Sequence, residues 1–505
     1  MPSRTPRQIG VIDVGSNTAR FVVFESSSAG TVRAVHEAKE VPRLGFGAGP
    51  DGRLSDEAIQ RGVAGVKRFA RLVRSLEVPR TLAVATSAVR DAPNGPEFVR
   101  AVERSSGVLL RIISGVEEAR YAYLGVASAW ELREDIVCDV GGGSLQLVEV
   151  HRGALRNSVS LPLGVLRLSQ RFLEHDPPKR REMEELRDYV RETLGSVFDA
   201  FQGESHGLYA VGGTVRSLAR AAIDFRSWPI GRVHGYPLFD HDIEALGELL
   251  EEMPADKRRA IPGIGSDRAD VVLAGIVVFR ELLRVTRADQ ITVSGTGIRE
   301  GIALEAVGAK LPAPAAELVH RSVLAASESF RFDAEHGREV TDCALGLFAV
   351  LADRFRWGKS EELALRAAAG MHDAGTAIDI WRHAHHSAYM IQNYPILGLN
   401  QREILLASMA AYVHEGSLLP SEWKKAYQPI LSPDDLDTAR ELGAVVEVAE
   451  LTSPFRPRFT SSGEGRSLGL AFSPPSGTSL RPRLGEKVAK TLQRAFDVEV
   501  RVRDS

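Results

Sequence analysis

The chain has 505 residues, enough for about three globular domains, and its hydrophobic content of 44%, charged content of 26% and net charge of −3 are ordinary for a globular protein. This charge gives no general attraction to nucleic acid or to anionic membranes, and no apolar run is long enough to be a signal peptide or a membrane span. Because two cysteines cannot build a disulfide framework, we expect a cytoplasmic protein that contacts neither nucleic acid nor membrane.

The first part of the chain alternates strands and helices. Residues 1–45 are predicted to form three strands, and Ser55 is predicted to cap a helix that ends near residue 76. A strand, a helix and a second strand are expected before Ser114, which opens a further helix. We therefore predict an α/β lobe over residues 1–132.

A second α/β lobe is predicted over residues 133–308. Apolar strands end in polar, glycine-rich turns, and a long charged helix is expected over 177–201. Ligands of open α/β sheets bind in crevices beyond the strand ends. Alanine- and leucine-rich periods then predict an all-helical domain over 309–431, followed by a small α+β segment over 432–505.

One short unit occurs twice. Asp13-Val14-Gly15 and Asp139-Val140-Gly141 each follow an apolar strand, begin a polar turn and lead into another apolar strand. Glycines let backbone N–H groups approach a phosphate closely. Two such turns could hold a phosphate chain from opposite sides, with Asp13 and Asp139 each offering a carboxylate to Mg²⁺. Ordinary Asx caps are the alternative for each aspartate taken alone.

Two neighbouring glutamates begin the helix after Ser114. Glu117 occupies the capping-box position and is expected to bind the backbone N–H of Ser114. Glu118 has no such local task, so it could accept a proton from an attacking water. On composition alone, the favoured interpretation is that both acids simply suit the helix N-terminus.

Arginines on loops of the same crevice could hold phosphate. Arg20 lies in the first hairpin, and Arg90 follows an apolar strand and small residues. A planar guanidinium suits bidentate phosphate contact, although a lone arginine is more often solvated.

Histidines gather in the predicted helical domain. His372-Asp373 on an alanine-rich helix is typical of an HD metal pair, and His336 could be a third ligand. No clear candidate near His414 supplies the distal aspartate that usually completes such a site, so structural histidines are the favoured interpretation. Further histidines lie nearby at His383, His385 and His386.

Six blocks in order and spacing resemble the exopolyphosphatase / guanosine-pentaphosphate phosphohydrolase family. The helical part, with His372-Asp373 and His386-Ser387-Ala388-Tyr389, is similar to the HD-like domain of its longer members. The blocks are Ile12 to Arg20, Ala85 to Arg90, Ser114 to Arg120, Asp139 to Ser144, Val211 to Thr214, and Ser294 to Gly301.

The resemblance implies two actin-like (ribonuclease H-like) α/β lobes, an all-helical HD-like domain and a small α+β C-terminal segment. It implies magnesium-dependent release of orthophosphate from polyphosphate ends or from guanosine pentaphosphate, with Glu118 as the base and Asp13 and Asp139 at the metal. A homodimer is the expected assembly. Phosphate contacts are implied for Gly15, Ser16, Asn17, Thr18, Arg20, Arg90, Gly142, Gly143, Ser144, Gly213 and Thr214.

One position departs from the family pattern. The family usually has glutamate where this chain has Gln146, and a neutral amide adds no negative charge to a metal site. Two other functions are kept open, and Gln146 favours the first of them. One is a binding module that senses polyphosphate or an alarmone without hydrolysing it, and the other is an ATP-dependent kinase of the same superfamily.

Overall fold

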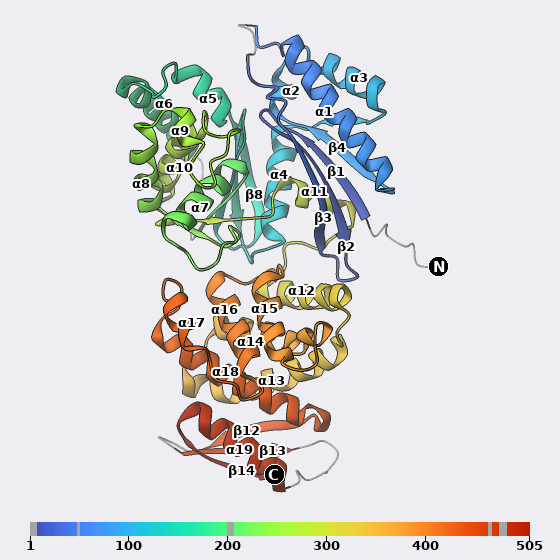
Figure 1. The fold of residues 1–505 in the computed structure, drawn as a ribbon, viewed down its shortest axis with the longest axis vertical. Coiled ribbons are helices and arrows are strands. Elements are labelled where there is room, and N and C mark those ends of the chain that lie inside the picture. Colours follow the sequence, from blue (N-terminus) through green and yellow to red (C-terminus); the bar gives the residue numbers. More distant parts are fainter. Residues whose placement is uncertain (1–7, 48–50, 199–206, 463–466, 474–481, 505) are drawn as a thin grey trace. The chain divides into compact units, whose positions relative to one another are not determined.

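The computed structural model describes residues 8–47, 51–198, 207–462, 467–473 and 482–504. The chain divides into two compact units, the first ending at Ala313 and the second beginning at Pro314 (Figure 1). Parts of the strand region predicted over 1–45 and of the helix predicted over 177–201 lie outside the described residues. Among the described residues, no helix has the length and apolar character needed to cross a membrane.

The first unit contains two mixed sheets (Figure 1). The first has the order β3-β2-β1-β4-β5, in which β1, β4 and β5 are parallel while β2 and β3 are antiparallel to their neighbours. Its strands are β1 (Gln8–Val14), β2 (Ala19–Ser26), β3 (Val32–Glu40), β4 (Thr81–Ala85) and β5 (Leu110–Ile112).

Alternate residues of β2 face opposite sides of this sheet, as strand geometry requires. Phe21 and Val23 pack with helices α1 (Asp56–Ser75) and α3 (Gly95–Ser106) on one side. Val22 and Phe24 pack on the other side with Tyr121 and Ile302. The sheet is therefore buried on both faces, and its polar turns are left at the strand ends.

The second sheet has the order β10-β11-β9-β6-β7-β8. Most residues of helix α10 belong to the core of this lobe, and helices α5, α6, α7 and α8 pack against α10. The strands are β6 (Asp135–Val140), β7 (Leu145–His151), β8 (Ala154–Leu161), β9 (Gly207–Val211), β10 (Pro237–Phe239) and β11 (Gln290–Val293); the helices are α5 (Val165–Phe172), α6 (Arg180–Phe198), α7 (Gly213–Phe225), α8 (Asp240–Glu251), α9 (Ala255–Arg258) and α10 (Val272–Thr286).

Helices α4 (Gly115–Ala127) and α11 (Ile298–Ala306) pack against each other with unusually close backbones. A Cβ atom at Gly125 would lie 2.2 Å from the carbonyl oxygen of Gly297, and one at Gly301 would lie 2.1 Å from that of Tyr121. Only glycine allows this approach at either position. The two helices thus form one rigid pair beside both sheets.

The second unit is helical and ends in a small sheet. Helix α18 (Pro433–Thr452) packs against α13, α14 and α16, although the sequence placed its residues in the C-terminal segment. The other elements are α12 (Ala315–Phe330), α13 (Ala334–Phe355), α14 (Lys359–Met371), α15 (His383–Asn393), α16 (Gln401–Val413), α17 (Ser421–Ala426), α19 (Pro482–Phe496), β12 (Arg458–Ser462), β13 (Ser467–Ser473) and β14 (Glu499–Asp504).

Candidate active site

The repeated acidic unit folds the same way in both lobes. The Gly15 amide donates to the Thr18 carbonyl at 3.0 Å, and the Gly141 amide donates to the Ser144 carbonyl at 3.0 Å. Each turn joins two antiparallel strands of its sheet, β1 to β2 in one lobe and β6 to β7 in the other. The internal repeat predicted from the sequence is therefore present as matching hairpins.

The two turns also contact each other. A Cβ atom at Gly142 would lie 3.1 Å from Ser16 Cβ and 3.2 Å from the Asn17 amide nitrogen. Within each hairpin the aspartate pairs with one cross-strand residue, which is Arg20 for Asp13 and Gln146 for Asp139. The turns therefore meet at a shared cleft, and equivalent positions carry different side chains in the two lobes.

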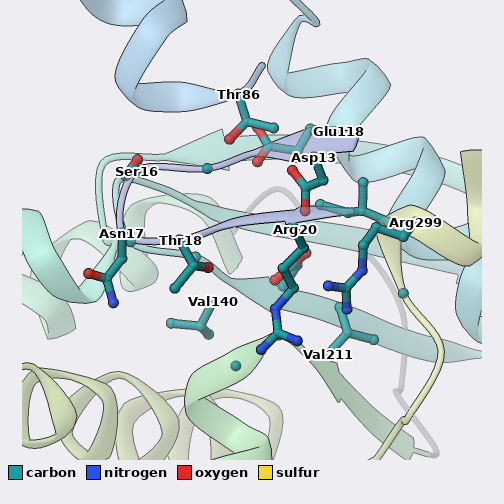
Figure 2. Close-up of a pocket in the computed structure, with 18 of the residues that line it drawn as sticks. Asp13, Ser16, Asn17, Thr18, Arg20, Thr86, Glu118, Val140, Val211 and Arg299 are labelled. Atoms are coloured by element: carbon teal, nitrogen blue, oxygen red, sulfur yellow. The ribbon is translucent and has the colours of Figure 1, made fainter. Parts of the chain in front are cut away.

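A polar pocket lies where the turns meet. Figure 2 shows the Asp13 and Glu118 carboxylates close together, and the guanidinium groups of Arg20 and Arg299 near each other. Ten of the residues predicted for the site line it: Asp13, Gly15, Ser16, Asn17, Thr18, Arg20, Glu118, Asp139, Gly142 and Gly213. Four predicted residues are not part of its wall: Arg90, Gly143, Ser144 and Thr214.

Those four residues support the wall from behind. Ser144 Oγ accepts a hydrogen bond from Gln146 Nε2 at 2.8 Å, and Thr214 Oγ1 accepts one from Arg268 Nη1 at 3.4 Å. A Cβ atom at Gly143 would lie 2.6 Å from the Ser16 hydroxyl oxygen, so this glycine permits close packing of the turns. Their direct contact with phosphate stays a prediction.

Glu118 is the most unusual acid of the pocket. The capping box forms as expected, since Glu117 Oε2 accepts from the Ser114 amide at 2.9 Å, and this leaves the Glu118 side chain free to face the cleft. Glu118 is only 4% exposed, and its Oε2 accepts a hydrogen bond from Arg90 Nη1 at 2.8 Å. Burial raises the pKa of Glu118 to about 7 despite the Arg90 partner.

Asp13 and Asp139 face the same pocket and disfavour each other's charge. Burial raises the pKa of Asp13, and burial together with the charge of Asp13 raises the pKa of Asp139 to about 6. Buried carboxylates that repel each other favour a cation between them, and Mg²⁺ takes such oxygen ligands together with water. The residues present therefore fit the magnesium ion that the sequence resemblance implies.

Three further arginines line the pocket, and the sequence prediction did not include them. Arg216 donates to the Gly212 carbonyl at 3.1 Å, Arg268 lies 3.6 Å from Asp267, and Arg299 lies 3.9 Å from Glu37. Burial lowers the pKa of Arg216 to about 10 and also lowers that of Arg268. Because guanidinium groups suit phosphate and carboxylate oxygens, arginines that line an open polar pocket are suited to an anionic ligand.

Only one of these three arginines lies in a sequence block that could have predicted it. Arg299 belongs to the block from Ser294 to Gly301, whereas Arg216 and Arg268 lie outside the blocks. With Arg20, the pocket brings together four arginines against the carboxylates of Asp13, Glu118 and Asp139.

Polar contacts of the segment before α10 join the lobes beside the pocket. Lys39 Nζ of β3 lies 2.6 Å from Asp267 Oδ2, and Asn17 Nδ2 donates to the Asp267 carbonyl at 3.0 Å. Arg43 Nη1 lies 2.6 Å from Asp270 Oδ2. The segment before α10 therefore binds the first lobe next to the glycine turn.

The three residues predicted as a second metal set also lie together, in the helical unit. His336 Nε2 and His372 Nε2 each lie 3.6 Å from Asp373 Oδ2.

Arginine guanidinium groups suit the recognition of phosphate, and carboxylates hold the metal ions of phosphoryl-transfer sites. The chain belongs to the Ppx/GppA phosphatase family, because residues 22–310 match that family and residues 319–429 match domain III of Ppx/GppA phosphatases. The family inferred from the six sequence blocks is thereby confirmed.

Known relatives match about three fifths of the chain. Exopolyphosphatase 1 of Mycobacterium leprae is 30% identical over 303 residues, which are 59% of this chain and 88% of that protein. The crystal structure of a Ppx/GppA family member from Aquifex aeolicus is 30% identical with a TM-score of 0.52, and the match covers 59% of this chain and 97% of that one. An exopolyphosphatase structure from Cytophaga hutchinsonii is 26% identical with a TM-score of 0.57, covering 60% and 99%. The predicted two-lobed, actin-like fold class with a helical C-terminal region is confirmed.

Proposed function

We propose that the chain hydrolyses the terminal phosphoanhydride bond of inorganic polyphosphate and releases orthophosphate. The buried Glu118 carboxylate carries this proposal, because it faces the pocket and its pKa is raised to about 7. A general base works best when its pKa lies near the operating pH. The relatives named as exopolyphosphatases support polyphosphate as the substrate.

In the proposed reaction, Glu118 accepts a proton from water while the water oxygen attacks the terminal phosphorus. The bond from that phosphorus to the bridging oxygen breaks, and the bridging oxygen stays on the shortened chain. The products are one orthophosphate and a polymer one unit shorter. Arg90 holds the Glu118 carboxylate through the 2.8 Å hydrogen bond, so the base keeps its orientation during proton transfer.

The pocket arginines would bind the phosphates and offset the charge that develops on their oxygens. Arg20, Arg216 and Arg299 lie close enough to influence one another electrostatically, so they present a compact positive surface. Backbone amides of the two glycine turns add donors at the same place. Such groups are fixed before the substrate arrives, which is how preorganised sites lower a barrier.

Asp13 and Asp139 would hold Mg²⁺, which when bound supplies positive charge to phosphate oxygens. Without the ion, the two aspartates repel an anionic substrate and each other, so we expect turnover to depend on magnesium.

The direct test measures phosphate release from long-chain polyphosphate with and without Mg²⁺. Glu118→Gln should lower kcat by at least about 100-fold while KM stays nearly unchanged. Glu117→Gln is the matched control, because the Glu117 side chain caps the helix by accepting from the Ser114 amide. This variant should keep activity within about twofold of the wild type. Near-normal activity of Glu118→Gln would exclude it as the base.

Guanosine pentaphosphate ends in the same kind of anhydride bond and is the second substrate to compare. Release from it at a similar kcat/KM would assign both reactions to this cleft. Binding of either compound by the wild type without phosphate release would instead support the sensing function, and ATP turnover that requires an acceptor would support a kinase.

A further inference from the structure

A second group of ligating side chains lies within residues 314–505. It draws on four helices: His336 of α13, His372 and Asp373 at the end of α14, His383 at the start of α15, and His414 directly after α16. Nothing in the proposed phosphatase reaction uses these residues.

Asp373 connects two triads in this group. Its Oδ2 atom lies 3.6 Å from the Nε2 atoms of both His336 and His372. Its Oδ1 atom lies 3.2 Å from His383 Nε2, which is in turn 3.4 Å from His414 Nε2. In each triad the candidate ligand atoms lie within 4.8 Å of one another.

Three of the histidines are held in one tautomer. The Nδ1 atoms of His372, His383 and His414 lie 2.8, 3.2 and 2.7 Å from the backbone carbonyl oxygens of Ala369, Ile380 and Ala411. A carbonyl can only accept, so each Nδ1 carries the proton and each neutral ring directs its Nε2 lone pair into the group. Metal-bound histidines are oriented by this same kind of contact.

The inward nitrogen atoms are not satisfied by the protein. His372 is fully buried, and its Nε2 atom has no hydrogen-bond partner among the described residues. Buried polar atoms without partners are rare. His383 and His414 direct two Nε2 lone pairs toward each other across 3.4 Å, which is unfavourable unless a cation or a proton lies between them.

Both His372 and His414 are almost fully buried, where a charged ring would be costly. A cation ligated by neutral rings satisfies their inward nitrogen atoms without charging either ring. One side of the group remains open, since the side chains of His336 and Asp373 are each 34% exposed.

We infer that Asp373 is the shared ligand of a divalent transition-metal centre, with His372 and His336 on one side and His383 and His414 on the other. Neutral imidazoles with one carboxylate suit Zn²⁺, Co²⁺, Fe²⁺ or Mn²⁺ better than Mg²⁺ or Ca²⁺. The exposed side leaves a coordination position for water or for an oxygen of a ligand, as in catalytic rather than closed structural sites. His383 and His414 thus supply ligands where the sequence offered no completing aspartate.

The test uses the full chain, freed of metal and then titrated with Co²⁺ or Zn²⁺ in excess Mg²⁺, so that oxygen-only sites are filled by magnesium. Visible d–d absorption reports Co²⁺ coordination by protein ligands, and elemental analysis after gel filtration counts Zn²⁺. The variants are Asp373→Asn and His383→Asn, which change partly exposed residues, with circular dichroism to confirm folding. His320→Asn on α12 is the control, because His320 is exposed and outside the group.

The wild type and His320→Asn should bind at least about one ion per chain, and Asp373→Asn and His383→Asn should each lose affinity by at least about tenfold. Glu118→Gln should bind like the wild type, which separates this centre from the proposed phosphatase site. Absence of a Co²⁺ spectrum in the wild type, or equal binding by Asp373→Asn and His383→Asn, would overturn the inference.

Discussion

The Arg90 guanidinium donates a 2.8 Å hydrogen bond to Glu118 Oε2, and Glu118 is almost fully buried. Burial favours the protonated acid, whereas the charge and hydrogen bond of Arg90 favour the carboxylate. The balance leaves the pKa of Glu118 at about 7, and this pKa sets the pH range in which the base can act.

The first prediction concerns pH. Glu118 accepts a proton only as a carboxylate, and its folded-state pKa is raised to about 7. Phosphate release should therefore rise with pH and reach half its maximum near pH 7, with little activity at pH 5. The check is kcat/KM for polyphosphate across pH 5 to 9 at fixed, saturating Mg²⁺. A flat profile would contradict the assignment.

The second prediction removes the partner of the base. Arg90→Gln deletes a charge that lowers the pKa of Glu118. The rising part of the pH profile of kcat/KM should therefore shift to a pH about one unit or more higher. Activity at pH 7 should fall and partly recover at pH 9. Arg104→Gln is the control, because Arg104 is exposed at the end of α3. A purely structural role of Arg90 would lower the profile without shifting it.

The third prediction concerns Gln146. Its side chain is 1% exposed, it lies directly across the strand pair from Asp139, and its Oε1 atom has no partner among the described residues. Cross-strand neighbours of this kind share one face of the sheet. Gln146→Glu should therefore add negative charge beside Asp139, raising magnesium-dependent phosphate release and lowering the half-saturating Mg²⁺ concentration by about tenfold.

The measurement for Gln146→Glu is the rate as a function of Mg²⁺ concentration, with Gln146→Ala as the comparison that removes the amide without adding charge. An unchanged or lower rate in Gln146→Glu would argue against a metal role for this position.

The fourth prediction concerns the contact between Lys39 and Asp267. This partly exposed pair joins the lobes at 2.6 Å, and pairs of this kind contribute at most about 1 kcal/mol. Lys39→Met should therefore lower kcat/KM by up to about fivefold, and less at high salt. Asp267→Asn also disturbs Arg268, so a double-mutant cycle isolates the pair. Strict additivity would mean that the contact has no effect on turnover.

The sequence predicted the parts of the site that local patterns encode. The repeated Asp-Val-Gly units predicted two equivalent turns because a turn and its flanking strands are contiguous in the chain. The Ser114 capping box similarly distinguished the role of Glu117 from that of Glu118. Its hydrogen bonds join residues only three positions apart in the sequence. Both features depend on neighbours in sequence.

The positive side of the pocket could not be predicted in the same way. Arg216, Arg268 and Arg299 come from α7, the segment before α10 and the start of α11, and only the tertiary fold brings them together. Arg90 was expected to contact phosphate, but its nearest acid is Glu118, on a different helix. The homodimer, the magnesium ion and the cytoplasmic location stay predictions.

The close backbone packing of α4 and α11 has a consequence for substrate length. Glu118 lies in the first turn of α4 and Arg299 in the first turn of α11, so both residues belong to the same closely packed helix pair. Opening or closing of the cleft would carry them together at a constant separation. The distance between Glu118 and Arg299 would then be the same whether the bound polymer is long or short.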